Sequence, residues 1–189
     1  MKHISSACVL GLWLAVLAAT PSPAVFIRVP TEQPTIQDGI DVARAGDTVL
    51  VADGVYRGAR NRDLDFKGKA ITVISERGAA QCIVDCESQG RGFIFHSGER
   101  YDVNNPALNS RLSGFTIRNG MGMNGGGILC SSNSSPILDS CRIESCRADG
   151  DGGGICCEAS SPFIETVEIS LGTAFQGGGI ACLNGSRPK

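Results

Sequence analysis

The chain has 189 residues, and its 17 lysine and arginine residues are nearly balanced by 19 aspartate and glutamate residues, for a formal net charge of −2. This balance excludes the basic surface that nucleic acid or an anionic membrane needs in a partner, so neither is expected. The length fits one domain with a core of its own.

The first 24 residues show the pattern of a secretory signal peptide. A basic start at Lys2 leads into an apolar run over residues 8–19, and small residues stand at Ser22 and Ala24. These are the three parts of such a peptide, and prolines end the run before it is long enough to span a membrane. We expect cleavage after Ala24 and export to the extracellular space, the periplasm or the outer cell surface. No transmembrane segment is expected in the mature chain.

Residues 25–60 predict an N-terminal cap made of a strand and a helix, followed by the first coil of a repeat structure. Thr35 followed three residues later by Asp38 indicates a reciprocal helix cap. Ile36 and Ile40 then share one helical face. We expect this short amphipathic helix to cover the open N-terminal end of the core.

Residues 61–189 predict further coils. Strand-like runs at 71–74, 82–84 and 93–95 are separated by turns that contain glycine. Residues 93 and 128 are 35 positions apart, whereas one coil needs about 26, so a segment at about 99–110 is interpreted as an insertion. Clear repeats begin at residue 112.

The pattern Gly-Gly-Gly-Ile-x-Cys occurs at residues 125–130, 152–157 and 177–182, with spacings of 27 and 25 residues. Such a period is typical of solenoids. Other columns repeat every 26 residues, namely Leu112, Leu138 and Ile164, then Phe115, Cys141 and Val167, then Ile117, Ile143 and Ile169. Apolar residues alternate with polar ones around these positions, which indicates short half-buried strands and no long helix.

These patterns predict an all-β fold, a right-handed parallel β-helix solenoid with a short N-terminal capping helix. Each strand pairs with its equivalent one coil away, about 4.8 Å along the axis, and like side chains stack inside. The repeat stops part-way through a coil at residues 184–189. We therefore expect a longer protein whose remaining C-terminal coils continue the stack.

The chain resembles bacterial exported proteins with a pectin-lyase-like right-handed β-helix over about residues 25–183. The motifs that carry the resemblance are Pro34-Thr35-Ile36-Gln37, Gly46-Asp47-Thr48-Val49, Gly54-Val55-Tyr56, Leu112-Ser113-Gly114-Phe115-Thr116-Ile117 and the Gly-Gly-Gly-Ile coils. The resemblance implies the fold. It also implies that an enzyme of this type would carry acidic calcium ligands with a basic proton abstractor, or paired carboxylates, on outward strand positions.

Two strands of each coil have outward positions that could carry such calcium ligands or carboxylates. The strand after the glycines offers Leu129, Cys156 and Ala181, none of which binds calcium through a carboxylate, so this face is expected to be inert. The strand after the Ser-Pro turn is polar, with outward positions at Ser113, Thr116, Arg118, Asp139, Arg142, Glu144, Glu165, Glu168 and Ser170.

Two interpretations of the polar face stay open. In the first, it is a solvated surface with ion pairs between neighbouring coils, Arg118 with Glu144 and Arg142 with Glu168. In the second, it is a calcium or carbohydrate site made of the residues Asp139, Glu165 and Glu168, with Arg142 as the basic partner. No cofactor other than calcium is expected, and no catalytic residue is predicted.

Eight cysteines follow the leader, an even number in a chain that is expected to be exported. Cys130, Cys157 and Cys182 are expected to stack inward, either as a ladder of free thiols or with a disulfide between Cys130 and Cys157 that leaves Cys182 for a further coil. His96 is the only histidine after the leader, so a zinc site is not expected.

Two classes of function are consistent with the sequence. The first is a secreted or cell-surface scaffold that is not catalytic and binds carbohydrate, such as a polysaccharide, or a cell-surface partner through its outer faces. The alternative is a polysaccharide lyase or glycoside hydrolase whose active site lies in coils beyond residue 189. The inert Leu129, Cys156 and Ala181 row favours the first, and fold analogy alone does not decide between them.

Overall fold

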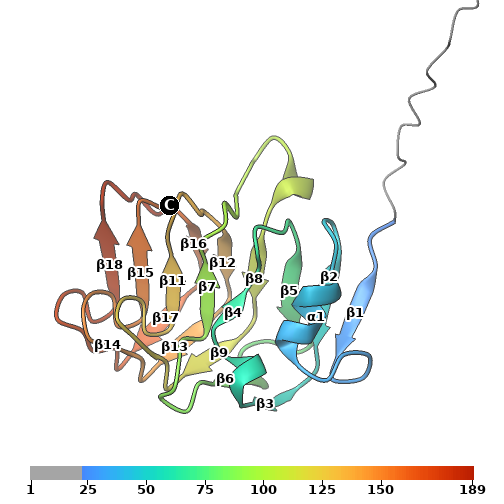
Figure 1. Cartoon of the computed structure of the whole chain (residues 1–189), viewed down its shortest axis with the longest axis horizontal. Coiled ribbons are helices and arrows are strands. Elements are labelled where there is room, and N and C mark those ends of the chain that lie inside the picture. The colour runs from blue at the N-terminus through green and yellow to red at the C-terminus, as the bar shows by residue number, and fades with distance from the viewer. Residues whose placement is uncertain (1–22) are drawn as a thin grey trace, which may run out of the picture.

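A computed structural model describes residues 23–189, and it is a parallel β-solenoid of about six turns (Figure 1). The predicted all-β solenoid with one short helix near the N-terminus is confirmed; its right-handed sense stays a prediction. The predicted signal peptide, residues 1–24, lies almost wholly outside the described residues. Within those residues, none of the helices has the length and apolar character needed to cross a bilayer.

Three stacked parallel sheets make up the wall of the solenoid, and each turn after the first contributes one strand to each of them. Sheet A has the order β1 (Phe26–Val29), β2 (Thr48–Val51), β5 (Thr72–Ser75), β8 (Arg111–Ser113), β12 (Ile137–Asp139) and β16 (Phe163–Glu165). Sheet B has the order β3 (Gly54–Tyr56), β6 (Cys82–Asp85), β9 (Thr116–Arg118), β13 (Arg142–Glu144) and β17 (Glu168–Ser170).

Sheet C and a small fourth sheet complete the turns. Sheet C has the order β4 (Leu64–Asp65), β7 (Phe93–Phe95), β11 (Ile128–Cys130), β15 (Ile155–Glu158) and β18 (Ile180–Leu183). The fourth sheet pairs β10 (Met121–Gly122) with β14 (Arg147–Ala148). Short 3₁₀ helices occupy Ala59–Asn61 and Pro106–Leu108.

The register confirms the columns that the sequence predicted. Leu138 stands opposite both Leu112 and Ile164 in sheet A. In sheet C, Ile155 stands opposite both Ile128 and Ile180, although those repeats are 27 and 25 residues apart. The loops absorb the difference in length, and the strand register is kept because a slip by one residue would turn the apolar side chains outward.

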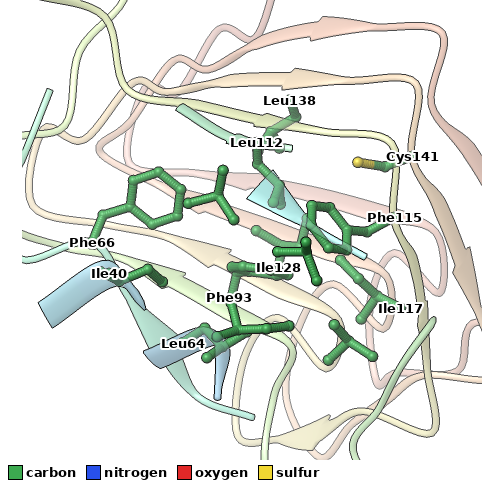
Figure 2. Close-up of a cluster of buried hydrophobic side chains, with 14 of the residues drawn as sticks. Ile40, Leu64, Phe66, Phe93, Leu112, Phe115, Ile117, Ile128, Leu138 and Cys141 are labelled. Atoms are coloured by element: carbon green, nitrogen blue, oxygen red, sulfur yellow. The ribbon is translucent and has the colours of Figure 1, made fainter. Parts of the chain in front are cut away.

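Figure 2 shows the core, which runs along the inside of the stack. Four fully buried phenylalanines fill its N-terminal half, namely Phe66, Phe93, Phe95 and Phe115. Neighbouring rings are close, with centroids 4.7 Å apart for Phe66 and Phe95 and 5.9 Å for Phe93 and Phe115. Tilted aromatic pairs at these distances stabilise a core beyond the area that they bury.

The N-terminal helix α1 (Ile36–Val42) forms as the sequence predicts. The hydroxyl oxygen of Thr35 accepts a hydrogen bond from the amide of Asp38, which satisfies one of the unpaired amides at the start of the helix. Ile36 and Ile40 are fully buried. At the other end, the ammonium of Lys69 donates to the carbonyls of residues 40, 41 and 43, so a side chain from the next turn caps the helix.

The last turn presents the inside of the stack to solvent. Ile180 is 41% exposed, whereas Ile128 and Ile155 in the same column are fully buried. The outer edge of β16 has two backbone hydrogen bonds from the end of the chain, since Ile164 donates to the carbonyl of Lys189 and Lys189 donates to that of Pro162. The prediction that further coils follow stays a prediction.

Candidate functional site

The four predicted site residues fall into two pairs that lie on different sheets. Asp139 is opposite Glu165 in sheet A, and Arg142 is opposite Glu168 in sheet B. The two sheets meet at a tight corner in which Ser140 has a φ of +51°. The corner turns the chain so that Arg142 and Glu168 border one groove and Glu165 borders another.

The first groove lies on the outer side of this corner and has a volume of about 480 Å³; we call it the corner groove. Its lining includes Arg77, Ser140, Arg142, Thr166 and Glu168. The predicted ion pair is present, with 3.5 Å between the guanidinium of Arg142 and the carboxylate of Glu168. Both side chains are well exposed, so the pair contributes little to stability.

Arg77 is also paired, because its guanidinium contacts the carboxylate of Asp53. The charged groups of the corner groove are therefore matched within the protein. The rest of its lining consists of small side chains, with no aromatic residue among them. The exposed ion pair agrees with the first interpretation of Arg142 and Glu168, that of a solvated surface.

Asp139 was predicted to be solvated, but only 9% of the residue is exposed. Its carboxylate accepts hydrogen bonds from the hydroxyls of Ser113 and Ser140, at 3.0 and 2.8 Å, and from the guanidinium of Arg111. Burial acts to raise the pKa of Asp139, but the hydrogen bonds from Ser140, Arg111 and Ser113 outweigh it and lower this pKa. The lone pairs of Asp139 are therefore committed to the protein.

Other positions on the predicted outward rows are also buried. Thr116 is 6% exposed because the segment after β5 lies over it, and its hydroxyl donates to the carbonyl of Ala79 at 2.7 Å. Cys156 and Ala181 are buried as well, so the row expected to be an inert outer face is largely covered. Arg118 lies opposite Glu144 as predicted, but its guanidinium bonds Asp85 at 3.0 Å instead.

The second groove, of about 360 Å³, lies between sheet A and the connection from β7 to β8; we call it the loop groove. This connection projects from the solenoid in Figure 1, where it carries the short helix Pro106–Leu108. The lining of the groove includes Tyr101, Asp102, Arg111, Phe163 and Glu165. Glu165 is the one predicted site residue among them.

The base of the connection is held by a buried carboxylate. Glu99 is 1% exposed, and its two oxygens accept hydrogen bonds from the backbone amides of Gly68 and Ser97, at 2.7 and 3.0 Å. The amide of Ser110 donates to the carbonyl of Arg100 at 3.0 Å, which closes the neck of the loop. These bonds fix the loop at both ends on the rigid stack.

Inside the loop, short side chains hold the backbone. The carboxylate of Asp102 accepts from the amides of Asn104 and Asn105, and the side-chain oxygen of Asn109 accepts from the amide of Asp102 at 2.6 Å. Bonds of this kind between a short polar side chain and nearby amides define turns. These bonds within the loop define its backbone conformation.

An aromatic pair forms the wall of the loop groove. The rings of Tyr101, from the loop, and Phe163, from β16, are stacked with centroids 4.8 Å apart and an interplanar angle of 28°. Both residues are partly exposed, and Ile137 beside them is 6% exposed. The groove thus combines an apolar wall with a small number of polar groups around it, which is the general character of small-molecule sites.

The polar groups around the loop groove have an acidic balance. Asp102 and Glu165 are carboxylates in its lining, and the guanidinium of Arg111 is bound to Asp139. Within residues 23–189, no group of three or more histidine, cysteine, aspartate or glutamate side chains is arranged to hold a metal ion. Asp139, Glu165 and Glu168 are thus not gathered into one cluster, and calcium binding stays a prediction.

The sequence did not identify Tyr101 and Phe163 as site residues. Phe163 occupies the outward position of β16, where an aromatic side chain in a half-buried strand is a usable signal. Tyr101 lies in the segment interpreted as an insertion. No repeat pattern indicates that this segment folds back over sheet A. Arg111 precedes the first clear repeat residue, so no repeated column marks it.

Cys130, Cys157 and Cys182 form one column across sheet C, as expected for a ladder of thiols. All eight cysteines in the described part of the chain are free thiols, and Cys130 and Cys157 are buried whereas Cys182 is exposed. Cys157 lies opposite both of the others in register. Either state of the ladder, reduced or disulfide-bonded, fits this register.

No family model, no curated protein and no solved structure matches this chain.

Proposed function

We propose that this chain is an exported, non-catalytic β-solenoid that binds carbohydrate in the loop groove. The observation that carries the proposal is the Tyr101–Phe163 wall, held against sheet A by a loop that is tied at both ends. A sugar ring has an apolar face of C–H groups and a rim of hydroxyls, so an aromatic wall with carboxylate and amide groups around it suits both parts.

The acidic rim restricts the kind of saccharide. A uronate polymer would bring carboxylates next to Asp102 and Glu165, and like charges at short range oppose binding. The one guanidinium in the lining, that of Arg111, is already bound to Asp139 and is not free to compensate. The proposed ligand is therefore a neutral or amino-bearing oligosaccharide, and pectin-like polyuronates are disfavoured.

Export and a non-catalytic role rest on separate features. The leader pattern of residues 1–24 supports export. A non-catalytic role is supported by the state of Asp139 and Arg142, since each is already bonded within the protein and neither is poised to act on a ligand in the loop groove.

Isothermal titration with a panel of neutral, amino-bearing and uronate oligosaccharides tests the proposal. Tyr101→Ala and Phe163→Ala are each expected to weaken binding of the neutral or amino sugar by about tenfold, which corresponds to about 1.4 kcal/mol. Phe175→Ala is the matched control, because this ring is 82% exposed and lies outside the groove.

The charge of Glu165 provides a second test of the loop groove. Glu165→Gln is expected to strengthen binding of uronates relative to neutral sugars, since it removes one of the repelling charges. Failure of every saccharide to bind the folded chain, or equal losses in the groove variants and in Phe175→Ala, would overturn the proposal. Release of shortened products from any polymer would show that the chain is an enzyme.

A further inference from the structure

Three cysteines from three consecutive turns form one column in sheet C. Cys130 in β11, Cys157 in β15 and Cys182 in β18 are direct partners in the strand register. Neighbouring strands are about 4.8 Å apart, and a disulfide requires Cα atoms about 4.4–6.8 Å apart. Cys157 therefore lies beside each of the other two, on the same side of the sheet and at a backbone separation that a disulfide can span.

Exposure to solvent differs along this column. Cys130 and Cys157 are fully buried, because a strand covers each of them on both sides. Cys182 lies in β18, at the outer edge of sheet C, and is exposed. A small reagent in water therefore reaches the column through Cys182 and meets Cys157 next.

The chemistry of Cys157 also differs from that of the other buried cysteines. The hydrogen bond with Cys130 has the largest effect on the pKa of the Cys157 thiol. Together with the hydrogen bond with Cys182, it lowers this pKa, although burial acts to raise it. Burial raises the pKa of Cys141, Cys146 and Cys156 to about 11, which keeps these thiols protonated and unreactive.

We propose that Cys157 and Cys182 form a thiol–disulfide exchange site for small disulfides at the β18 edge of sheet C. This inference is independent of the carbohydrate site, because it rests on sheet C and uses no residue of the loop groove. The exchange would fasten the last turn to the turn before it, through a covalent bond between β15 and β18.

The reaction proceeds in two exchanges. Partial burial and the neighbouring Cys157 raise the pKa of Cys182, so its thiolate is the minor form. This thiolate attacks one sulfur of a small disulfide RSSR; the S–S bond breaks, RS⁻ leaves and takes up the proton, and Cys182 carries a mixed disulfide. The thiolate of Cys157 then attacks the Cys182 sulfur and releases the second RSH. The two cysteines lose two electrons and two protons, and these convert RSSR into two RSH.

Oxidised glutathione is the probe for a test on the reduced, folded chain. Non-reducing peptide mapping is expected to find one linked pair, Cys157 with Cys182, and the intact mass is expected to fall by the mass of two hydrogen atoms. Cys182→Ser changes an exposed side chain and is expected to abolish both the glutathione adduct and the linked pair. Cys157→Ala is expected to accumulate the adduct on Cys182, because the resolving thiol is missing.

Cys141→Ala is the matched control, since it removes a buried thiol that lies outside this column and should leave the Cys157–Cys182 bond to form. A circular dichroism spectrum establishes that each buried-site variant has folded, and Cys182→Ser keeps the test decisive if one has not. The proposal is overturned if Cys182 is not modified, if its adduct persists in the unsubstituted chain, or if Cys130 and Cys157 are the first pair linked.

Discussion

The last two turns of the solenoid contain the same strand pattern in two different environments. Ile155 in β15 and Ile180 in β18 occupy one column, and both follow three glycines. Ile155 is fully buried, whereas Ile180 is 41% exposed. An inward position in a solenoid is therefore buried only when turns lie on both sides of it, because no single turn covers its own apolar face.

The same contrast applies to the glycines and to the charged pairs. A side chain added at Gly154 would meet the next turn, but one added at Gly179 would meet nothing within 4 Å. Asp85 is surrounded by groups from neighbouring turns, whereas Glu168 is at the edge of sheet B. Each pair of positions offers a matched experiment on how much a neighbouring turn contributes to the free energy of unfolding.

The largest difference is expected for the isoleucines. Ile155→Ala should lower the free energy of unfolding by about 3 kcal/mol, since it removes buried methyl groups and leaves a cavity. Ile180→Ala should cost about 1 kcal/mol or less, because part of that side chain is already in water. Urea unfolding curves of the two variants measure this. Equal losses would show that the last turn is covered in solution.

The two glycine positions should show the second-largest difference in stability. In Gly154→Ala the new Cβ would lie 2.6 Å from the carbonyl oxygen of Gly179 and 2.7 Å from a methyl group of Ile169. Such overpacking costs about 2 kcal/mol. Gly179→Ala should change stability by about 0.5 kcal/mol at most. Thermal melting of both variants tests the difference, and a tolerated Gly154→Ala would contradict the close approach of the two turns.

The charged pairs should show the smallest difference. Burial acts to raise the pKa of Asp85, but hydrogen bonds from Asn119, Arg118 and the Glu87 amide outweigh it and lower the pKa to about 2. Since this is below the unfolded value of about 3.9, Asp85 stabilises the fold above about pH 4 and loses that effect as the pH falls towards 2.

Asp85→Asn is therefore expected to cost about 1–2 kcal/mol at neutral pH and to flatten the acid limb of the stability curve. Glu168→Gln should cost about 0.5 kcal/mol or less, because its pair with Arg142 is exposed. Melting temperatures measured from pH 7 down to pH 2 compare the two. An unchanged acid limb in Asp85→Asn would mean that the Asp85 network does not form.

The repeated part of the chain was the part that the sequence could predict. Leu112, Leu138 and Ile164 align because each stacks on a copy of its own environment, so a column of similar residues is enough to identify the register. The helix at Ile36 was predictable for a local reason, since its cap and its apolar face lie within a few residues of each other.

The environment of the outward residues could not be predicted in the same way. Thr116 is covered by the segment after β5, and Arg118 turns to Asp85; both neighbours belong to the turn before the clear repeats begin. Tyr101 meets Phe163 from a loop that has no counterpart in other turns. Contacts between unlike turns leave no periodic signal, and the candidate site consists of such contacts.

The long connection between β7 and β8 leaves the stack around it undisturbed. Val73 and Leu112 are 39 residues apart in sequence, yet they are direct neighbours in sheet A, just as Leu112 and Leu138 are across 26 residues. The solenoid thus tolerates a change in length at this corner at little cost to its framework. The position is suited to exchange: replacing residues 100–109 with other loops would give a family of binding proteins on one unchanged frame.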